Sequence, residues 1–231
     1  MNPWNPWNLA KIPSHAGALF LKTLLKVLVA LVALAVLGLL FVRSVRSTSA
    51  EPFSIPRAHL TGWTLELAPP DDPLGALLTL TPNTGLMPPL SRELFARMGE
   101  SLHHPRAAMP VVLRGEFDRA IAGSVTPDAL LDLARQAGLE SSTIQPQCMA
   151  RRRDSAPGVV RGIYFLVFDV PQFGQFREQV AKRIGGGSES SLFDPVALSP
   201  VVVAANLDGD TARWLPLRAA ESDCFAPVVI E

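Results

Sequence analysis

The chain has 231 residues, and its 21 Lys and Arg residues balance its 21 Asp and Glu residues, so the formal net charge is zero. Residues 1–46 carry five basic residues and no acidic one, a charge of +5, whereas the rest of the chain has 16 basic and 21 acidic residues, a charge of −5. Hydrophobic residues make up 48% of the sequence, and the mean hydropathy is +0.24. These values exclude a disordered chain, a nucleic-acid binder defined by bulk charge and a simple cytosolic enzyme.

An apolar segment near the N-terminus predicts a membrane anchor. Residues 16–42 contain no charge except Lys22 and Lys26, and as a helix they would extend about 40 Å, enough to cross a bilayer. Lys22 and Lys26 share one helix face and are expected to reach the headgroup layer, while Arg43 and Arg46 close the other end. A buried core helix and a cleaved signal peptide are the alternatives.

The flanking charges do not orient this anchor, because basic residues are equally numerous on its two sides. The short N-terminal tail and the position of both cysteines in the large domain favour a cytoplasmic N-terminus and a periplasmic C-terminal domain. Gly38 would allow close packing against another helix, and the segment has no histidine or carboxylate that could bind a pigment, a haem or a proton. We therefore expect a single-pass protein of a bacterial inner or intracytoplasmic membrane, without a cofactor. Its predicted parts are a Trp/Pro-rich tail (1–15), the anchor (16–46), a linker (47–57) and a globular domain (58–231).

The globular domain is predicted to be α+β, a mixed sheet-and-helix fold that follows the single transmembrane helix. Trp63, Leu65 and Leu67 alternate with polar positions and predict a half-buried strand. After a turn cluster at 69–73, residues 74–80 are expected to form its hairpin partner. The other expected elements are a helix at 89–98, a strand at 110–113, a helix from Thr126 as N-cap to Gly138, a central strand at 159–170, a helix at 173–184, a flexible loop at 185–191 and closing strands at 201–207 and 214–217.

Cys148 and Cys224 are the two cysteines of the chain. In an oxidising compartment they predict one disulfide, which would close a loop of roughly 75 residues and contribute about 4–5 kcal/mol. Two unpaired buried thiols are the alternative. No neighbouring His or Cys completes a zinc site, so we predict no metal.

Arg151, Arg152 and Arg153 follow the first cysteine. A solvated loop is one interpretation, and electrostatic docking to an acidic partner or to anionic headgroups is the other. No aromatic residues are interleaved with these arginines, so nucleic acid is not an expected partner.

No motif in the sequence predicts catalysis. His103 and His104 are adjacent and would point in different directions, and no carboxylate lies at a metal-site spacing from them. An enzyme would need a pocket that gathers residues such as His59, His103, Asp118 and Asp169.

The N-terminus carries a tandem Asn-Pro-Trp at residues 2–7. Trp4 and Trp7 suit a membrane interface or a docking segment against a partner subunit. This terminus resembles those of light-harvesting and reaction-centre accessory polypeptides of phototrophic bacteria. The domain is similar to uncharacterised Arg/Ala/Pro-rich bacterial proteins in three phrases, which lie at 63–67, 193–200 and 214–218. The resemblance implies a non-pigmented accessory subunit, and no pigment-binding residue is carried over because the anchor lacks a histidine.

The sequence therefore predicts a non-catalytic structural or accessory subunit that braces its neighbours in a larger membrane complex. Its expected partners are membrane lipid and other membrane subunits, reaction-centre or light-harvesting polypeptides among them. The alternative is a membrane-anchored periplasmic enzyme or ligand-binding module.

Overall fold

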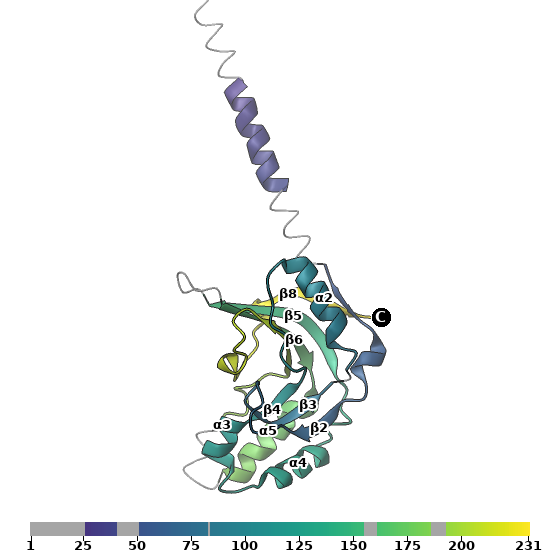
Figure 1. Cartoon of the computed structure of the whole chain (residues 1–231), viewed down its shortest axis with the longest axis vertical. Coiled ribbons are helices and arrows are strands. Elements are labelled where there is room, and N and C mark those ends of the chain that lie inside the picture. Colours follow the sequence, from purple (N-terminus) through teal and green to yellow (C-terminus); the bar gives the residue numbers. More distant parts are fainter. Residues whose placement is uncertain (1–25, 41–50, 83, 155–160, 186–192) are drawn as a thin grey trace, which may run out of the picture. The chain divides into compact units, whose positions relative to one another are not determined.

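The computed structural model describes residues 26–40, 51–82, 84–154, 161–185 and 193–231 (Figure 1). The chain divides into two compact units, Met1–Thr48 and Ser49–Glu231. In the first unit the described residues form one helix, at 26–40. Its ten large hydrophobic side chains are all exposed, from 49% at Val36 to 72% at Leu39.

The predicted transmembrane anchor is wrong. Among the described residues, no helix is both long enough and apolar enough to cross a membrane. The predicted localisation, with a single membrane span and a periplasmic domain, is wrong for the same reason. Lys26 and Gly38 lie on this helix, whereas the other predicted interface residues of the N-terminal segment lie outside the described residues: Trp4, Trp7, Lys22, Arg43 and Arg46.

The second unit is an α+β domain built on two sheets (Figure 1). The larger sheet has the strand order β1-β8-β5-β6-β7, and the smaller has the order β2-β3-β4. Every pairing is antiparallel except that of β1 with β8, which is parallel. The strands are β1 (Phe53–Ile55), β2 (Thr64–Leu67), β3 (Ala76–Thr81), β4 (Met109–Leu113), β5 (Gln145–Asp154), β6 (Arg161–Asp169), β7 (Val201–Asn206) and β8 (Cys224–Ile230).

Local signals explain where the longer helices begin and end. Thr126 caps the helix α4 (Pro127–Gln136) by accepting the N–H of Ala129, and Gly138 follows that helix with a φ of 74°, which glycine adopts readily. The other helices are α2 (Met87–Met98), α3 (Arg114–Glu116), α5 (Pro171–Ile184), the π-helical turn η2 (Phe117–Ile121) and the 3-10 helices η1 (Arg57–Leu60), η4 (Ala212–Trp214) and η5 (Glu221–Asp223).

Strand β6 is an interior strand of the larger sheet, paired on both sides, and its run of β-branched and aromatic residues predicts such burial. Residues 162–168 are all buried. Tyr164, Leu166 and Phe168 belong to the main hydrophobic core, while Ile163 and Phe165 belong to a second cluster. Strands β5 and β7 pair with the two edges of β6, and its side chains pack into one hydrophobic cluster on each face, so neither face is open to solvent.

Three strand assignments differ from the sequence predictions. The strand expected at 214–217 is absent from the described ladders, and the segment contains Pro216, which has no N–H to donate to a ladder. The arginine triplet lies in β5 rather than in a loop. Strands β1 and β8 are additional, and β8 contains Pro227, which argues against a strand when the sequence is considered alone.

Candidate functional site

A disulfide joins β5 to β8. Cys148 and Cys224 are 76 residues apart in sequence, and their Cα atoms are 5.7 Å apart. The predicted disulfide is confirmed. It lies at the point where the C-terminal strand pairs with the centre of the larger sheet, so it fixes β8 against β5.

The arginine triplet is divided between internal ion pairs and the surface. Arg152 donates to the Asp223 carboxylate at 2.5 and 3.4 Å, and Arg153 donates to Glu100 at 2.5 Å. Burial opposes ionisation of Asp223, but hydrogen bonds from Arg152 and from a backbone N–H still hold its pKa below the ordinary value. Arg151 is exposed, makes no ion pair within the described part of the chain, and lies 5.7 Å from the ring centroid of Phe225. Two of the three charges are therefore neutralised by the domain itself.

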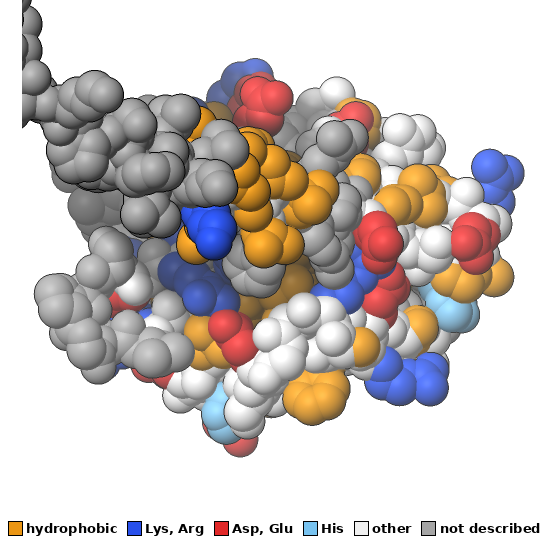
Figure 2. Space-filling model, turned by 90° about the horizontal axis from the view of Figure 1, so that it is seen from above, with side chains coloured by type: hydrophobic (Ala, Val, Ile, Leu, Met, Phe, Trp, Pro, Cys, Tyr) orange, Lys and Arg blue, Asp and Glu red, His pale blue; other side chains and the backbone are white. Residues whose placement is uncertain are grey.

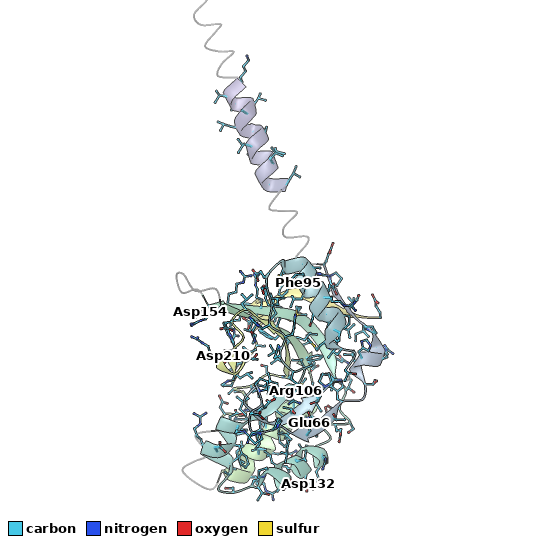
Figure 3. The ribbon with its side chains drawn as sticks, in the orientation of Figure 1. Glu66, Phe95, Arg106, Asp132, Asp154 and Asp210 are labelled. Carbon is cyan, nitrogen blue, oxygen red and sulfur yellow. A yellow bond between two sulfur atoms is a disulfide. The ribbon has the colours of Figure 1, made fainter. Side chains whose placement is uncertain are left out.

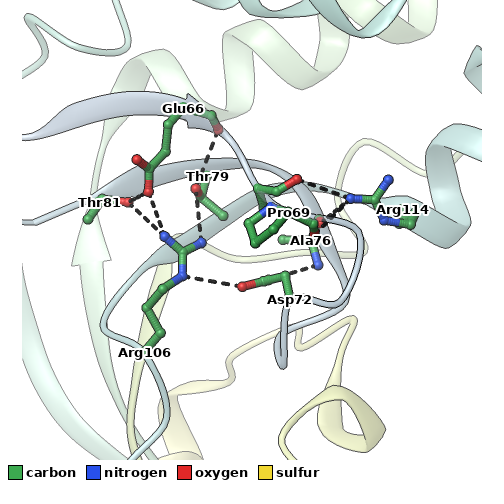
Figure 4. Close-up of polar contacts among 9 residues, drawn as sticks. Glu66, Pro69, Asp72, Ala76, Thr79, Thr81, Arg106 and Arg114 are labelled. Atoms are coloured by element: carbon green, nitrogen blue, oxygen red, sulfur yellow. Dashed lines mark hydrogen bonds and ion pairs between the residues drawn. The ribbon is translucent and has the colours of Figure 1, made fainter.

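A polar cluster around Arg106 joins residues of β2 and β3 and the turn between them (Figure 4). Its guanidinium donates to Glu66 Oε1 at 2.5 Å, to Asp72 Oδ1 at 3.2 Å and to Thr79 Oγ1 at 3.4 Å. Figure 3 shows Glu66 and Arg106 close together in the domain. The Thr81 hydroxyl donates to Glu66 Oε1 at 2.6 Å, and this bond, followed by those from Arg106, holds the pKa of Glu66 below its ordinary value.

The Arg106 cluster is suited to holding a turn and is not suited to acid–base catalysis. Arg114 donates to the carbonyl oxygens of Ala68, Pro69 and Ala76, so two arginines fasten the turn between β2 and β3 (Figure 4). The carboxylate of Asp72 also accepts the Ala76 N–H at 3.2 Å. A carboxylate held ionised by a fixed cation is a poor proton donor at neutral pH, because a general acid needs a pKa near the working pH.

A second ion pair is fully buried. Arg177 on α5 is 0% exposed, and all five of its N–H groups are used. Two donate to Glu116, at 2.7 and 3.2 Å, and the others reach the carbonyl oxygens of Val111, Asp194 and Pro195 at 2.8–2.9 Å. This pair joins α5 to the end of β4, the α3 turn and the segment at 193–195, so its role is structural.

The four residues that the sequence offered for an active site lie on different elements of the domain. His59 lies on η1, His103 forms a bridge with the end of β7, Asp118 lies on η2, and Asp169 ends β6. No hydrogen bond or ion pair links any two of these four residues in the structure. His104 directs Nδ1 to the carbonyl oxygen of Ala204 at 3.0 Å. Among the described residues, no group of His, Cys, Asp and Glu side chains could hold a metal ion.

A cleft of about 450 Å³ lies between η1, the α4–β5 loop and the end of β8. This volume falls within the range typical of ligand sites. Trp63 lines the cleft and is 4% exposed, and its indole N–H is buried without an acceptor in the structure. The remaining lining residues are Arg57, Leu60, Thr61, Gly62, Glu140, Ser141, Ser142, Thr143, Ile144, Gln145 and Ile230.

The sequence does not reveal this cleft, because its lining comes from segments near 60, 140 and 230. One sequence signal could have suggested the cleft. The Gly62-Trp63 pair follows the turn that begins at Pro56, and this places a large aromatic residue beside a loop. Figure 2 shows that acidic, basic and apolar side chains are interspersed on one face of the molecule, with no large patch of a single charge there.

Comparison with known proteins adds no assignment: no family model, no curated protein and no solved structure matches this chain. The resemblance to photosynthetic accessory polypeptides therefore stays a prediction. The tandem Asn-Pro-Trp on which it depends lies outside the described residues.

Proposed function

We propose that the protein is a non-catalytic accessory subunit that binds other polypeptides within a larger assembly. The observation that carries this proposal is the helix at 26–40, whose ten large hydrophobic side chains are at least 49% exposed. A continuous apolar surface of this kind is unfavourable in water and marks an interaction site. A partner polypeptide that packed against the helix would remove this surface from solvent.

The domain has features that suit a scaffold. The Cys148–Cys224 disulfide and the buried Arg177–Glu116 pair fix strands and helices that are distant in sequence. A rigid domain keeps a binding surface in one shape, which lowers the entropy cost of association. The resemblance of the N-terminus makes reaction-centre and light-harvesting polypeptides the first partners to examine.

The test is the size of the native particle that contains the full chain. A tagged full-length protein is expressed in its source cells, and extracts are separated on a native gel. Cross-linking of the same extracts identifies the polypeptides that contact the tagged protein. We expect the protein to migrate in a particle much larger than its own 24.9 kDa. Migration only as a 24.9 kDa monomer would contradict the proposal.

A pair of lysine substitutions tests the role of the helix. Leu34→Lys places a charge on the helix at a side chain that is 70% exposed, and we expect it to release the protein from the particle. Gln136→Lys changes an exposed residue at the end of α4 and serves as the matched control. Equal retention of both variants in the particle would show that the helix is not the contact.

A further inference from the structure

The ladder between β5 and β8 stops partway along β8. Its last pair is Cys148 with Pro227, although both strands continue beyond that pair. Gln147 is an extra residue in the pairing of β5 with β6, and such a bulge bends its strand and increases the local twist. Strand β5 therefore separates from the end of β8.

The cleft opens where the missing part of the ladder would be. Continuing the antiparallel register from Cys148–Pro227 would pair Gln145 with Ile230. Both of these residues instead line the cleft. The space beside the end of β8 is thus the place that a neighbouring strand would fill.

The end of β8 has an open backbone edge on this side. Glu231 directs its N–H to the Ile55 carbonyl at 3.0 Å, and its own carbonyl accepts the Arg57 N–H at 2.9 Å, so Glu231 faces β1. Backbone groups of successive strand residues point to opposite sides. Val228 and Ile230 therefore face away from β1, and no described strand pairs with them there.

Side chains around this edge add binding groups. The Trp63 N–H is buried without an acceptor, which costs free energy unless a bound group supplies one. The exposed Arg57 side chain forms no ion pair with any described residue. The hydroxyls of Ser141 and Ser142 donate to backbone carbonyls at 3.2 and 2.6 Å, so their oxygens can still accept.

We infer that this cleft binds an extended segment of a partner polypeptide, which adds as a strand beside Val228–Ile230 and directs a carboxylate to Arg57. The N–H and C=O groups of Val228 and Ile230 recur every second residue, which is the spacing that a strand backbone matches. The unpaired guanidinium selects an acidic side chain or a C-terminal carboxylate. This inference rests on the proposed function and identifies where the domain would hold its partner.

The test uses a library of random linear octapeptides, half of them with one fixed Glu, screened against the full-length protein labelled with ¹⁵N. We expect Glu-containing octapeptides to bind and to shift the NMR signals of the Ile230 amide and the Trp63 indole. In the best binder, N-methylation of alternate residues should weaken binding at least about tenfold, while methylation of the intervening residues should change it little.

Matched variants then locate the site. Trp63→Phe and Arg57→Gln should each weaken binding of the selected octapeptide by about 3–10-fold. Trp214→Phe removes another buried indole N–H without an acceptor, outside the cleft, and Arg92→Gln changes an exposed arginine on α2, so both should bind as the wild type does. Thermal melting of each variant confirms that the fold is retained.

Several results would overturn the inference. These are the absence of any octapeptide that binds, an N-methyl scan without alternation, and NMR shifts away from the cleft.

Concentration-dependent dimers that Trp63→Phe disrupts would instead identify a second copy as the occupant. If Leu34→Lys releases the native particle but Trp63→Phe and Arg57→Gln leave it intact, the proposed function holds and the cleft inference falls. Octapeptide binding to a protein that is monomeric in cells would support the cleft inference and contradict the proposed function.

Discussion

Replacing Arg177 by methionine tests the account of the buried ion pair. The substitution keeps an unbranched side chain of similar length but removes all five N–H donors. It leaves the Glu116 carboxylate, whose side chain is 7% exposed, with a single described hydrogen bond, from the Leu113 N–H at 2.9 Å. It also leaves three backbone carbonyls without the donor that they now have.

The expected loss follows from this geometry. Breaking a buried ion pair by removing one partner typically costs about 3–5 kcal/mol, because the remaining charge is buried without compensation. A domain of this size has a total stability of about 5–15 kcal/mol, so the variant should lose a large part of it. The melting temperature should fall by about 6–20 °C, given 2–4 °C for each kcal/mol in a domain of this length.

Urea unfolding followed by circular dichroism measures this loss. Arg135→Met is the control, because Arg135 and Asp132 form an exposed pair at 3.5 Å that should contribute less than about 1 kcal/mol. The double variant Glu116→Leu/Arg177→Met should be less destabilised than Arg177→Met alone, since no buried charge remains. A loss below about 1 kcal/mol for Arg177→Met, or a double variant as unstable as the sum of its singles, would refute the reasoning.

Three further predictions concern the disulfide, one carboxyl group and one helix cap. The Cys148→Ser/Cys224→Ser variant should lose up to about 4–5 kcal/mol in urea unfolding, because the bond closes a loop across 76 residues; an unchanged midpoint would contradict this. In an NMR titration, the Glu66 carboxyl should have a pKa below 4.5 that rises in Thr81→Val, since the hydroxyl bond favours the ionised form. The lowered pKa contributes stability that is present above pH 4.5 and is lost as the pH falls through the lowered pKa. Equal titration curves for the wild type and Thr81→Val would count against the Thr81 bond. Thr126→Ala should destabilise the domain by about 1 kcal/mol in the same unfolding assay, whereas Thr126→Ser should not. Equal losses of stability in the two variants would show that the Thr126 hydroxyl does not cap α4.

Sequence patterns predicted those elements whose signals are local. The Thr126 cap, the proline after it and Gly138 delimit α4 within a few residues, because capping and chain reversal depend on adjacent backbone groups. The apolar run of β6 predicts a central strand, because only a strand covered on both faces has continuous burial. The presence of two cysteines predicted the disulfide between them. Hydropathy also predicted a membrane span, but among the described residues no helix is long and apolar enough to form one.

By itself, the sequence determined the α+β alternation of the domain, its longer helices, its fully buried strand β6 and its disulfide. The tertiary structure decided the rest. Strand β5 carries three arginines, two of which pair with Asp223 and Glu100, and these partners lie 71 and 53 residues away. The open edge of β8 exists because a bulge at Gln147 ends a ladder between strands about 80 residues apart. Such features depend on which distant segments burial brings together, and periodicity within one segment does not specify that choice.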